Sequence, residues 1–292
     1  MFYRAFGLTI QTDVKLPLPA AADDHTADVL IEEGIRSIDT PGAWIQCGAT
    51  AWAKPRLLRL EIPGQATLHI EAGSLVRYQI HKASSDGGFM SPPVFTTAIG
   101  ALLQQRGIAL LHAAAVRNAD DTLLLAGSAG SGKSTLAAAL TLQGFSHLSD
   151  DLAAVNDLGQ IIPSELPCAL WQNATKSLGI PKDELIPLRP PIQKYWWNPR
   201  VITVQPTRPN RVFILSRTHT PSPQVTPIVG NERIIALYEN VPRRRILHAF
   251  ASPANTFRAV TSIAAASHFQ RLALPIQTNS VRNALDLLLQ SS

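Results

Sequence analysis

The sequence predicts an α/β protein that begins with an antiparallel β-rich domain, and three observations support this fold class. Residues 2–82 hold several short stretches in which apolar and polar side chains alternate, the pattern of half-buried strands. Residues 122–140 combine an apolar run, a glycine-rich loop and a run of good helix formers, the pattern of an α/β core. The chain has 292 residues, of which 46% are hydrophobic and 16% charged, so it can bury a substantial core in one large domain or two.

The first domain is predicted to span residues 1–88. Its main alternating stretches are 6–10, 58–62, 66–70 and 76–80. Pro63-Gly64 and Gly73-Ser74 separate the later ones at hairpin spacing, so we expect an antiparallel meander. This domain would cover the sheet of the second domain or hold a peptide by strand addition. The polar run 83–88 marks the boundary, and residues 89–292 form the second domain.

The second domain is expected to begin with a helix and an apolar strand. The helix spans residues 93–105, where apolar residues recur at helical spacing, and Gly107 follows its end. The strand covers residues 108–116 and is interrupted by His112. A lone histidine in an apolar strand is usually a satisfied core residue, so its role depends on what lies near it.

The glycine-rich loop that follows has the Gly-x-x-x-x-Gly-Lys-Ser pattern of a P-loop. Its residues, with the threonine after them, are Gly127, Ser128, Ala129, Gly130, Ser131, Gly132, Lys133, Ser134 and Thr135. Glycines let successive backbone N–H groups converge on phosphate oxygens, and the next helix directs the positive end of its dipole at the same phosphates. We expect Lys133 to reach the β- and γ-phosphates and Ser134 to hold Mg²⁺. The loop therefore predicts that ATP and Mg²⁺ bind here.

An acidic pair after the loop bears on whether phosphate is transferred, hydrolysed or only sensed. Asp150 and Asp151 are adjacent and lie at the end of a predicted strand. Beside a P-loop, one carboxylate can hold the metal while the other accepts a proton from an attacking hydroxyl. The pair favours a kinase, because an ATPase needs only the first carboxylate.

The residues after the acidic pair are expected to form further strands and helices. In order, these are strand 152–155, a turn at 156–159, strand 160–162, helix 169–178, strand 211–216, helices 232–239 and 253–268, edge strand 272–276 and a terminal helix capped by Asn279. Residues 181–209 contain seven prolines and predict a long, partly stiff loop. Its Trp196 and Trp197 either anchor a substrate or pack the loop down. Arg243-Arg244-Arg245 either stabilise a phosphoryl group or form a solvated face.

The central residues resemble the active site of the HPr kinase/phosphorylase family, whose P-loop kinase domain is related to phosphoenolpyruvate carboxykinases. His112 lies 21 residues before Lys133 and Asp150 lies 17 residues after it, as in the family pattern. The resemblance, which covers residues 111–155, implies that Asp151 is the base for the acceptor serine. It also implies that Asp150 is a magnesium or water partner and that His112 is a polar group oriented at the same site.

The chain departs from this family in three places. Thr135 stands where the bifunctional enzymes carry an acidic residue, no Pro-Gly-Arg-Asn-like segment follows the core, and the N-terminal domain is unlike theirs. The whole chain is more similar to the HPr-kinase-related lasso peptide kinases, on residues 3–10, 111–115 and 149–151. This second resemblance implies an ATP- and Mg²⁺-dependent kinase for a serine of a ribosomally made precursor peptide.

Other functions stay open alongside this one. They are a serine kinase of a small HPr-like protein, a small-molecule kinase, and a non-catalytic nucleotide sensor or regulatory ATPase. The acidic pair argues against a sensor, which has no need of a proton acceptor. The acceptor serine, the nucleotide preference, a reverse phosphorylase reaction and assembly into a homo-oligomer are left undecided.

Composition and charge predict a cytoplasmic protein without nucleic-acid or membrane partners. No apolar run approaches the roughly eighteen residues of a membrane span, and the N-terminus lacks the features of a signal peptide. The net charge of +5 is mild, and the basic residues are scattered apart from the three arginines at 243–245. Cys47 and Cys168 have no metal or redox spacing, which fits a reducing compartment.

Overall fold

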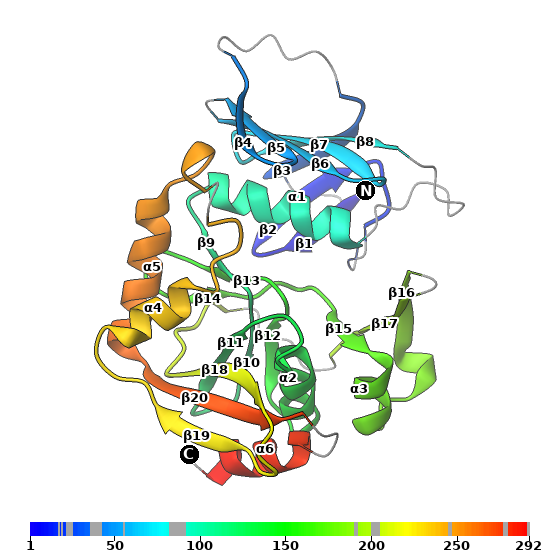
Figure 1. Ribbon diagram of the computed structural model, residues 1–292. Helices are drawn as coiled ribbons and strands as arrows, with labels where there is room; N and C mark the ends of the chain where they lie inside the picture. The colour runs from blue at the N-terminus through cyan, green and yellow to red at the C-terminus, as the bar shows by residue number, and fades with distance from the viewer. Residues whose placement is uncertain are drawn as a thin grey trace. The chain divides into compact units, whose positions relative to one another are not determined.

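The computed structural model has a mixed α/β fold with several sheets (Figure 1). It describes residues 1–16, 18, 20–21, 26–35, 43–54, 56–81, 92–189, 192–199, 205–244, 247–276 and 280–290. The chain forms two compact units: unit 1 is Met1–Leu110 with Arg243–Thr256, and unit 2 is Leu111–Pro242 with Phe257–Ser292. The predicted domain boundary after residue 88 lies outside the described residues and stays a prediction.

Unit 1 contains an eight-stranded sheet with the order β1-β2-β3-β8-β7-β6-β5-β4. Its strands are β1 (Phe2–Ala5), β2 (Leu8–Thr12), β3 (Val29–Glu33), β4 (Ile45–Gly48), β5 (Ala51–Lys54), β6 (Leu57–Ile62), β7 (Ala66–Glu71) and β8 (Leu75–Ile80). Strands β4 to β8 are an antiparallel meander. The prediction of a wholly antiparallel domain is wrong at β3, which runs parallel to β2 and β8. Residues 13–28 connect β2 to β3, and a connection of that length allows a parallel crossover.

Helix α1 (Pro92–Gln105) packs against β7 and β8, as Figure 1 shows, and confirms the predicted helix. Gln105 fixes its end, because Nε2 donates to the Ile70 carbonyl at 3.0 Å and Oε1 accepts from the Gly73 N–H at 2.9 Å. Gly107 follows with φ 82°, the left-handed conformation expected after a helix. Side-chain hydrogen bonds therefore tie α1 to the meander.

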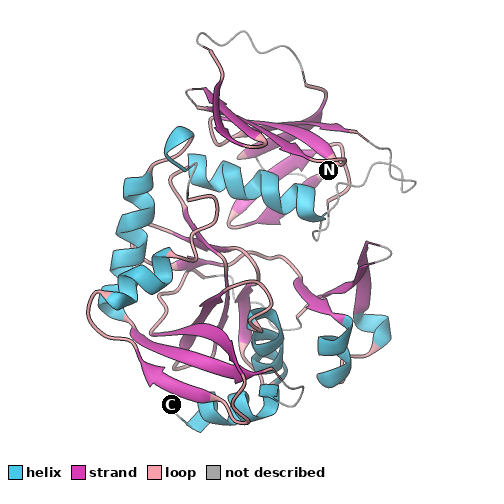
Figure 2. Ribbon diagram, in the orientation of Figure 1, coloured by secondary structure: helices cyan, strands magenta, loops and turns pink. Residues whose placement is uncertain are grey.

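Unit 2 is built on a six-stranded mixed sheet with the order β12-β10-β11-β18-β20-β19 (Figure 2). Its strands are β10 (Ala113–Arg117), β11 (Thr122–Gly127), β12 (Ser146–Ser149), β18 (Arg211–Thr218), β19 (Gln224–Pro227) and β20 (His268–Pro275). Strands β11, β18 and β20 are parallel to one another. Helices α2 (Lys133–Leu142) and α6 (Ser280–Gln290) pack against each other and share a hydrophobic core with the sheet. The glycine-rich loop begins at the carboxyl end of β11 and leads into α2.

A three-stranded sheet in unit 2 corrects the prediction for residues 169–209. Strands β15 (Cys168–Trp171), β17 (Ile192–Trp197) and β16 (Leu185–Arg189) pair antiparallel in that order, with α3 (Gln172–Ser177) and the 3₁₀ helix η1 (Lys182–Glu184) between β15 and β16. The observed helix α3 therefore begins three residues after the predicted start at residue 169. The predicted loop contains two strands, β16 and β17. Pro187 is tolerated because β16 is an edge strand. Trp197 is buried with Ala138 of α2, which holds this sheet against the core.

The other elements are β9 (Ala109–Leu111), β13 (Ala153–Val155), β14 (Ile161–Ile162), α4 (Glu232–Tyr238), the 3₁₀ helix η2 (Leu247–Ala249) and α5 (Pro253–Ala266). The antiparallel pairing of β13 with β14 confirms the predicted turn. The prediction of an edge strand at 272–276 is wrong, since β20 pairs on both sides. Pro275 is compatible with this place because the pairing with β19 ends at Ala273. Asn279, the predicted cap of α6, lies outside the described residues.

Candidate active site

The glycine-rich loop, residues 128–132, joins β11 to α2. Gly127 ends β11 with φ 144°, and a Cβ atom there would lie 2.4 Å from the carbonyl oxygen of Leu215 on β18. Gly132 precedes α2 with φ 108° in the left-handed region. Both positions therefore require glycine. The first turn of α2 lines a cavity, and the unpaired N–H groups of a helix start favour an anion there.

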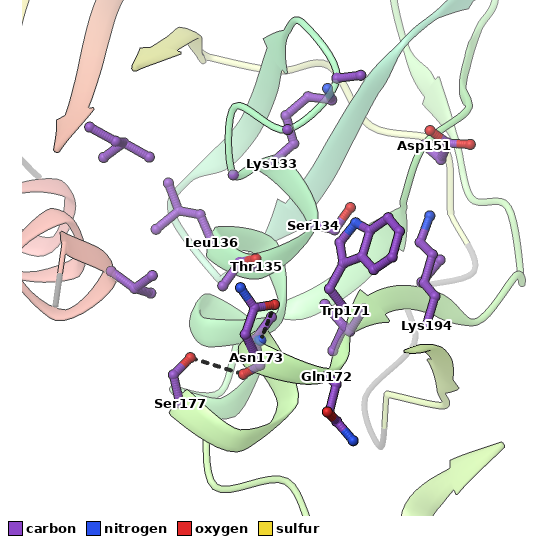
Figure 3. A pocket seen from close by; sticks show the side chains of 18 of the residues that line it. Lys133, Ser134, Thr135, Leu136, Asp151, Trp171, Gln172, Asn173, Ser177 and Lys194 are labelled. Carbon is purple, nitrogen blue, oxygen red and sulfur yellow. Dashed lines mark hydrogen bonds between the residues drawn. The ribbon is translucent and has the colours of Figure 1, made fainter. Parts of the chain in front are cut away.

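The cavity has a volume of about 1010 Å³ and lies within unit 2 (Figure 3). Its walls come from the glycine-rich loop, α2, β15, α3 and β17, together with His112, Asp151 and Arg217. Among the lining residues are four basic side chains and a single carboxylate: Lys133, Lys176, Lys194, Arg217 and Asp151. This excess of positive charge favours a polyanionic ligand.

Lys133, the first residue of α2, is 5% exposed. Its Nζ donates hydrogen bonds to the carbonyl oxygens of Gly127 at 2.7 Å and Ser128 at 3.0 Å. Burial lowers the pKa of Lys133, while the charges of Asp151 and Asp150 oppose this shift. The ammonium is thus held over the loop, where the sequence pattern predicts contact with phosphates.

His112 and Asp151 meet at the cavity from different parts of the sequence. His112 lies between β9 and β10, Asp151 lies between β12 and β13, and Nε2 of the imidazole is 3.1 Å from Oδ1 of the carboxylate. A carboxylate can only accept, so Nε2 carries the proton. This hydrogen bond lowers the pKa of Asp151, and the charges of Lys194 and Lys133 lower it further. Asp151 is therefore ionised at neutral pH and oriented by His112.

The backbone at Asp151 is strained. Its φ is 65°, and the Leu152 N–H donates to the Asp150 carbonyl at 2.7 Å across it. Such an i to i+2 hydrogen bond around a residue of positive φ is a γ-turn. Strain of this kind costs about 1–3 kcal/mol and clusters at functional sites. The turn also separates the two acids, since the Asp151 side chain is 61% exposed whereas Asp150 is 3% exposed.

Asp150 is not among the residues that line the cavity. Its Oδ2 accepts from the Ala169 N–H at 2.9 Å and lies 3.5 Å from Cys168 Sγ, whereas Oδ1 is buried with no hydrogen-bond partner in the described chain. Cys168 Sγ is also 3.8 Å from the Ser134 carbonyl oxygen, so both residues predicted to hold Mg²⁺ flank the same thiol. The described residues contain no cluster of three or more His, Cys, Asp or Glu that would suit a metal. The unpaired Oδ1 of Asp150 is a ligand of the kind that suits Mg²⁺, which takes one or two carboxylates together with substrate phosphates.

His147 on β12 is a buried polar neighbour of Asp150 that no sequence motif marks. It is 3% exposed, and neither ring nitrogen has a hydrogen-bond partner among the described residues. Burial lowers its pKa, and the negative charge of Asp150 opposes that shift. The imidazole is therefore neutral and contributes no positive charge beside Asp150.

Asn240 and Arg217 also contact the loop, although no local pattern marks either residue. The Asn240 carbonyl accepts from the His112 N–H at 2.7 Å, and its side-chain Oδ1 accepts from the Gly127 N–H at 2.8 Å. Arg217 Nε donates to the Gly130 carbonyl at 3.2 Å. One asparagine thus fixes both the histidine and the start of the loop, while Arg217 adds a cation beside it.

The tryptophans of the proline-rich segment and the arginines at 243–245 are both candidates for substrate contact, and the structure places them differently. Trp196 and Trp197 are 8% and 2% exposed, so they pack the segment down. Trp171 is 55% exposed and lines the cavity instead. Arg243 and Arg244 belong to unit 1, and Arg245 lies outside the described residues, so their predicted role is untested. No helix in the described part of the chain is both long and apolar enough to cross a membrane.

Comparisons with known proteins add little to this geometry. No protein-family model and no curated protein matches the chain. Among solved structures, the HPr(Ser) kinase/phosphatase from Coxiella burnetii matches with 13% sequence identity and a TM-score of 0.24, over 62% of this chain and 97% of that one. A TM-score this low does not establish a shared fold. The residues of the cavity are therefore the evidence for function.

Proposed function

We propose that the protein is an ATP- and Mg²⁺-dependent kinase that phosphorylates a hydroxyl, that of a serine. The observation that carries the proposal is the Asp151 carboxylate, which His112 orients at 3.1 Å in the cavity that Lys133 and Ser134 also line. A nucleotide sensor needs a phosphate-binding loop. It does not need an oriented carboxylate in the same cavity.

The loop and Lys133 would bind the triphosphate. Lys133 would exchange its hydrogen bonds to the Gly127 and Ser128 carbonyls for oxygens of the β- and γ-phosphates. Ser134 and Asp150 would hold Mg²⁺, which when bound neutralises negative charge on these phosphates. The glycine-rich loop would supply backbone N–H groups, so most of the binding is positioning and charge stabilisation.

Asp151 would orient the acceptor and take its proton. The acceptor oxygen forms a bond to the γ-phosphorus, the bond from that phosphorus to the bridging oxygen breaks, and ADP leaves. The hydroxyl proton passes to the Asp151 carboxylate. A lowered pKa makes Asp151 a weak base, which suits a loose transition state with little bond formation to the attacking oxygen. A base placed in this way contributes about 10²–10⁴-fold in rate.

The acceptor we propose is a serine of a ribosomally made, lasso-type precursor peptide in the cytoplasm. The similarity of residues 3–10, 111–115 and 149–151 to lasso peptide kinases supports this acceptor. A serine of a small HPr-like protein, or a small molecule, would use the same catalytic residues. The acceptor is therefore tested separately from the phosphoryl transfer.

The test incubates the protein with Mg-ATP and a serine-bearing precursor peptide and measures the intact mass of the peptide. We expect a gain of one phosphoryl group that Asp151→Asn abolishes while ATP binding is kept, because asparagine tolerates positive φ. Lys133→Ala should weaken both ATP binding and transfer. Asp157→Asn, in the exposed turn between β13 and β14, is the matched control and should retain activity.

Three results would change the proposal. Normal turnover by Asp151→Asn would refute its role as the base. Phosphorylation of a free metabolite or an HPr-like protein, with no gain on peptides, would replace the acceptor. ATP hydrolysis that no acceptor changes would favour a regulatory ATPase.

A further inference from the structure

Trp171 and Lys194 form a pair that neither the loop pattern nor the acidic pair accounts for. They are directly opposite each other in the antiparallel pairing of β15 with β17. Lys194 Nζ lies 5.8 Å from the centre of the Trp171 ring, within the range of a cation–π contact. Both side chains line the cavity. A rigid sheet thus presents an ammonium group on an aromatic support.

The Lys194 ammonium has no Asp or Glu within ion-pair distance among the described residues. In Figure 3 its end points towards Asp151, and the Trp171 indole lies between Lys194 and Ser134. Lys194 is close enough to help lower the pKa of both Asp151 and Lys133.

An anion between Lys133 and Lys194 would offset the repulsion between their ammonium groups. Two ammonium groups in one cavity repel each other, and a negatively charged group between them turns that repulsion into attraction for both. Lys133 approaches from the loop, and Lys194 approaches from the side of Asp151. In the proposed reaction, the group that passes from the loop side to the Asp151 side is the γ-phosphoryl group.

We infer that Lys194, supported by Trp171, is a second cation for the γ-phosphoryl group and contacts it from the acceptor side. This inference rests on the proposed function, since it needs a nucleoside triphosphate on the loop. It assigns a catalytic role to the β15–β17–β16 sheet. The ligand is the terminal phosphoryl group, so ATP should be bound through Lys194 and ADP should not.

The test measures the affinities for Mg-ATP, Mg-ADP and Mg-ADP with aluminium fluoride by calorimetry, which requires no acceptor. Lys194→Met should weaken Mg-ATP or the aluminium fluoride complex about 10- to 100-fold and leave Mg-ADP unchanged, as expected for loss of a charge-assisted hydrogen bond. Lys194→Arg keeps the charge and should restore most of the affinity. Trp171→Leu should cost about 3-fold through loss of the cation–π contact, and Trp171→Phe should cost less.

Lys182→Met is the matched control, because Lys182 is exposed on η1 and does not line the cavity. Equal affinities of wild type and Lys194→Met for both triphosphate-like ligands would overturn the inference. An equal loss of affinity for Mg-ADP would also overturn the inference, since Lys194 would then contribute to nucleotide binding in general and not to the γ-phosphoryl group. If wild type bound no nucleotide, or Lys133→Ala bound it equally well, the proposed function itself would fail, which is a different outcome.

Discussion

Replacement of Asn240 by alanine removes two hydrogen bonds of a single side chain. Oδ1 accepts from the Gly127 N–H at 2.8 Å, and Nδ2 donates to the Ala236 carbonyl of α4 at 2.8 Å. The backbone carbonyl of residue 240 would still accept from the His112 N–H, which lies 2.7 Å away. The substitution therefore isolates the link between α4 and the start of the glycine-rich loop.

The expected loss of stability follows from these two bonds. Each neutral hydrogen bond contributes about 1 kcal/mol, so we expect a decrease of about 2 kcal/mol in the free energy of unfolding, and more where the Gly127 N–H stays unpaired. The effect on the site should be larger than stability alone suggests. A displacement of about 1 Å at a catalytic group can cost about 100-fold in rate, so kcat/KM should fall about 10- to 100-fold.

Asn210→Ala is the matched control, because Asn210 binds the opposite end of the same strand. Its Oδ1 accepts from the Thr122 N–H at 2.7 Å, and Nδ2 donates to Asp121 Oδ1 at 2.8 Å. Both variants should lose similar stability in urea unfolding. Only Asn240→Ala should weaken Mg-ATP binding by calorimetry. Equal losses of ATP affinity in the two variants, or no loss in Asn240→Ala, would show that Asn240 does not position the glycine-rich loop.

Three further outcomes are expected. Gly127→Ala should abolish ATP binding, since its Cβ would meet a carbonyl oxygen at 2.4 Å. Gly130 has φ 78° and open space around it, so Gly130→Ala should lower the free energy of unfolding by only about 1 kcal/mol. His112→Ala should raise the pKa of Asp151 towards its ordinary value, so the acid limb of the kcat/KM profile should move to higher pH; an unmoved limb would contradict the pairing. Because the folded pKa of Asp151 is lowered, its hydrogen bond with His112 should stabilise the wild type above the unfolded pKa of Asp151. This stabilisation should be lost as the pH falls through the folded pKa, which acid titration of wild type against His112→Ala would measure.

The parts of the site that local sequence predicts are those set by consecutive residues, whereas His112 and Asp151 are expected together only from the family resemblance. The strand, loop and helix around Lys133 depend on local backbone conformation, so their pattern can be recognised directly. Asn240 is different, because it binds Gly127 across 113 residues of sequence. Nothing near Asn240 requires that contact. It depends on where the chain after α4 lies relative to the end of β11.

Two of the errors in the predicted fold, the loop over residues 181–209 and the edge strand at 272–276, have a common cause. Prolines at residues 187 and 275 suggested a loop and an edge strand, because proline cannot donate to a ladder. The cost of this missing hydrogen bond depends on whether the side of the strand that the proline nitrogen faces has a partner strand. β16 has a partner on one side only, and Pro275 lies beyond the pairing with β19. Proline thus restricts the position of a strand in the sheet more than it restricts the presence of the strand.

The γ-turn at Asp151 explains how two adjacent acids can have different roles. The Asp150 carboxylate accepts a hydrogen bond from the Ala169 N–H, and the Asp150 backbone carbonyl accepts one from the Leu152 N–H. His112 fixes the Asp151 carboxylate. These contacts offset a strain of about 1–3 kcal/mol. The tight turn at positive φ places one carboxylate in the interior beside Cys168 and the other in the cavity. The residue pair alone predicts a division of labour, but the backbone conformation decides which acid faces the acceptor.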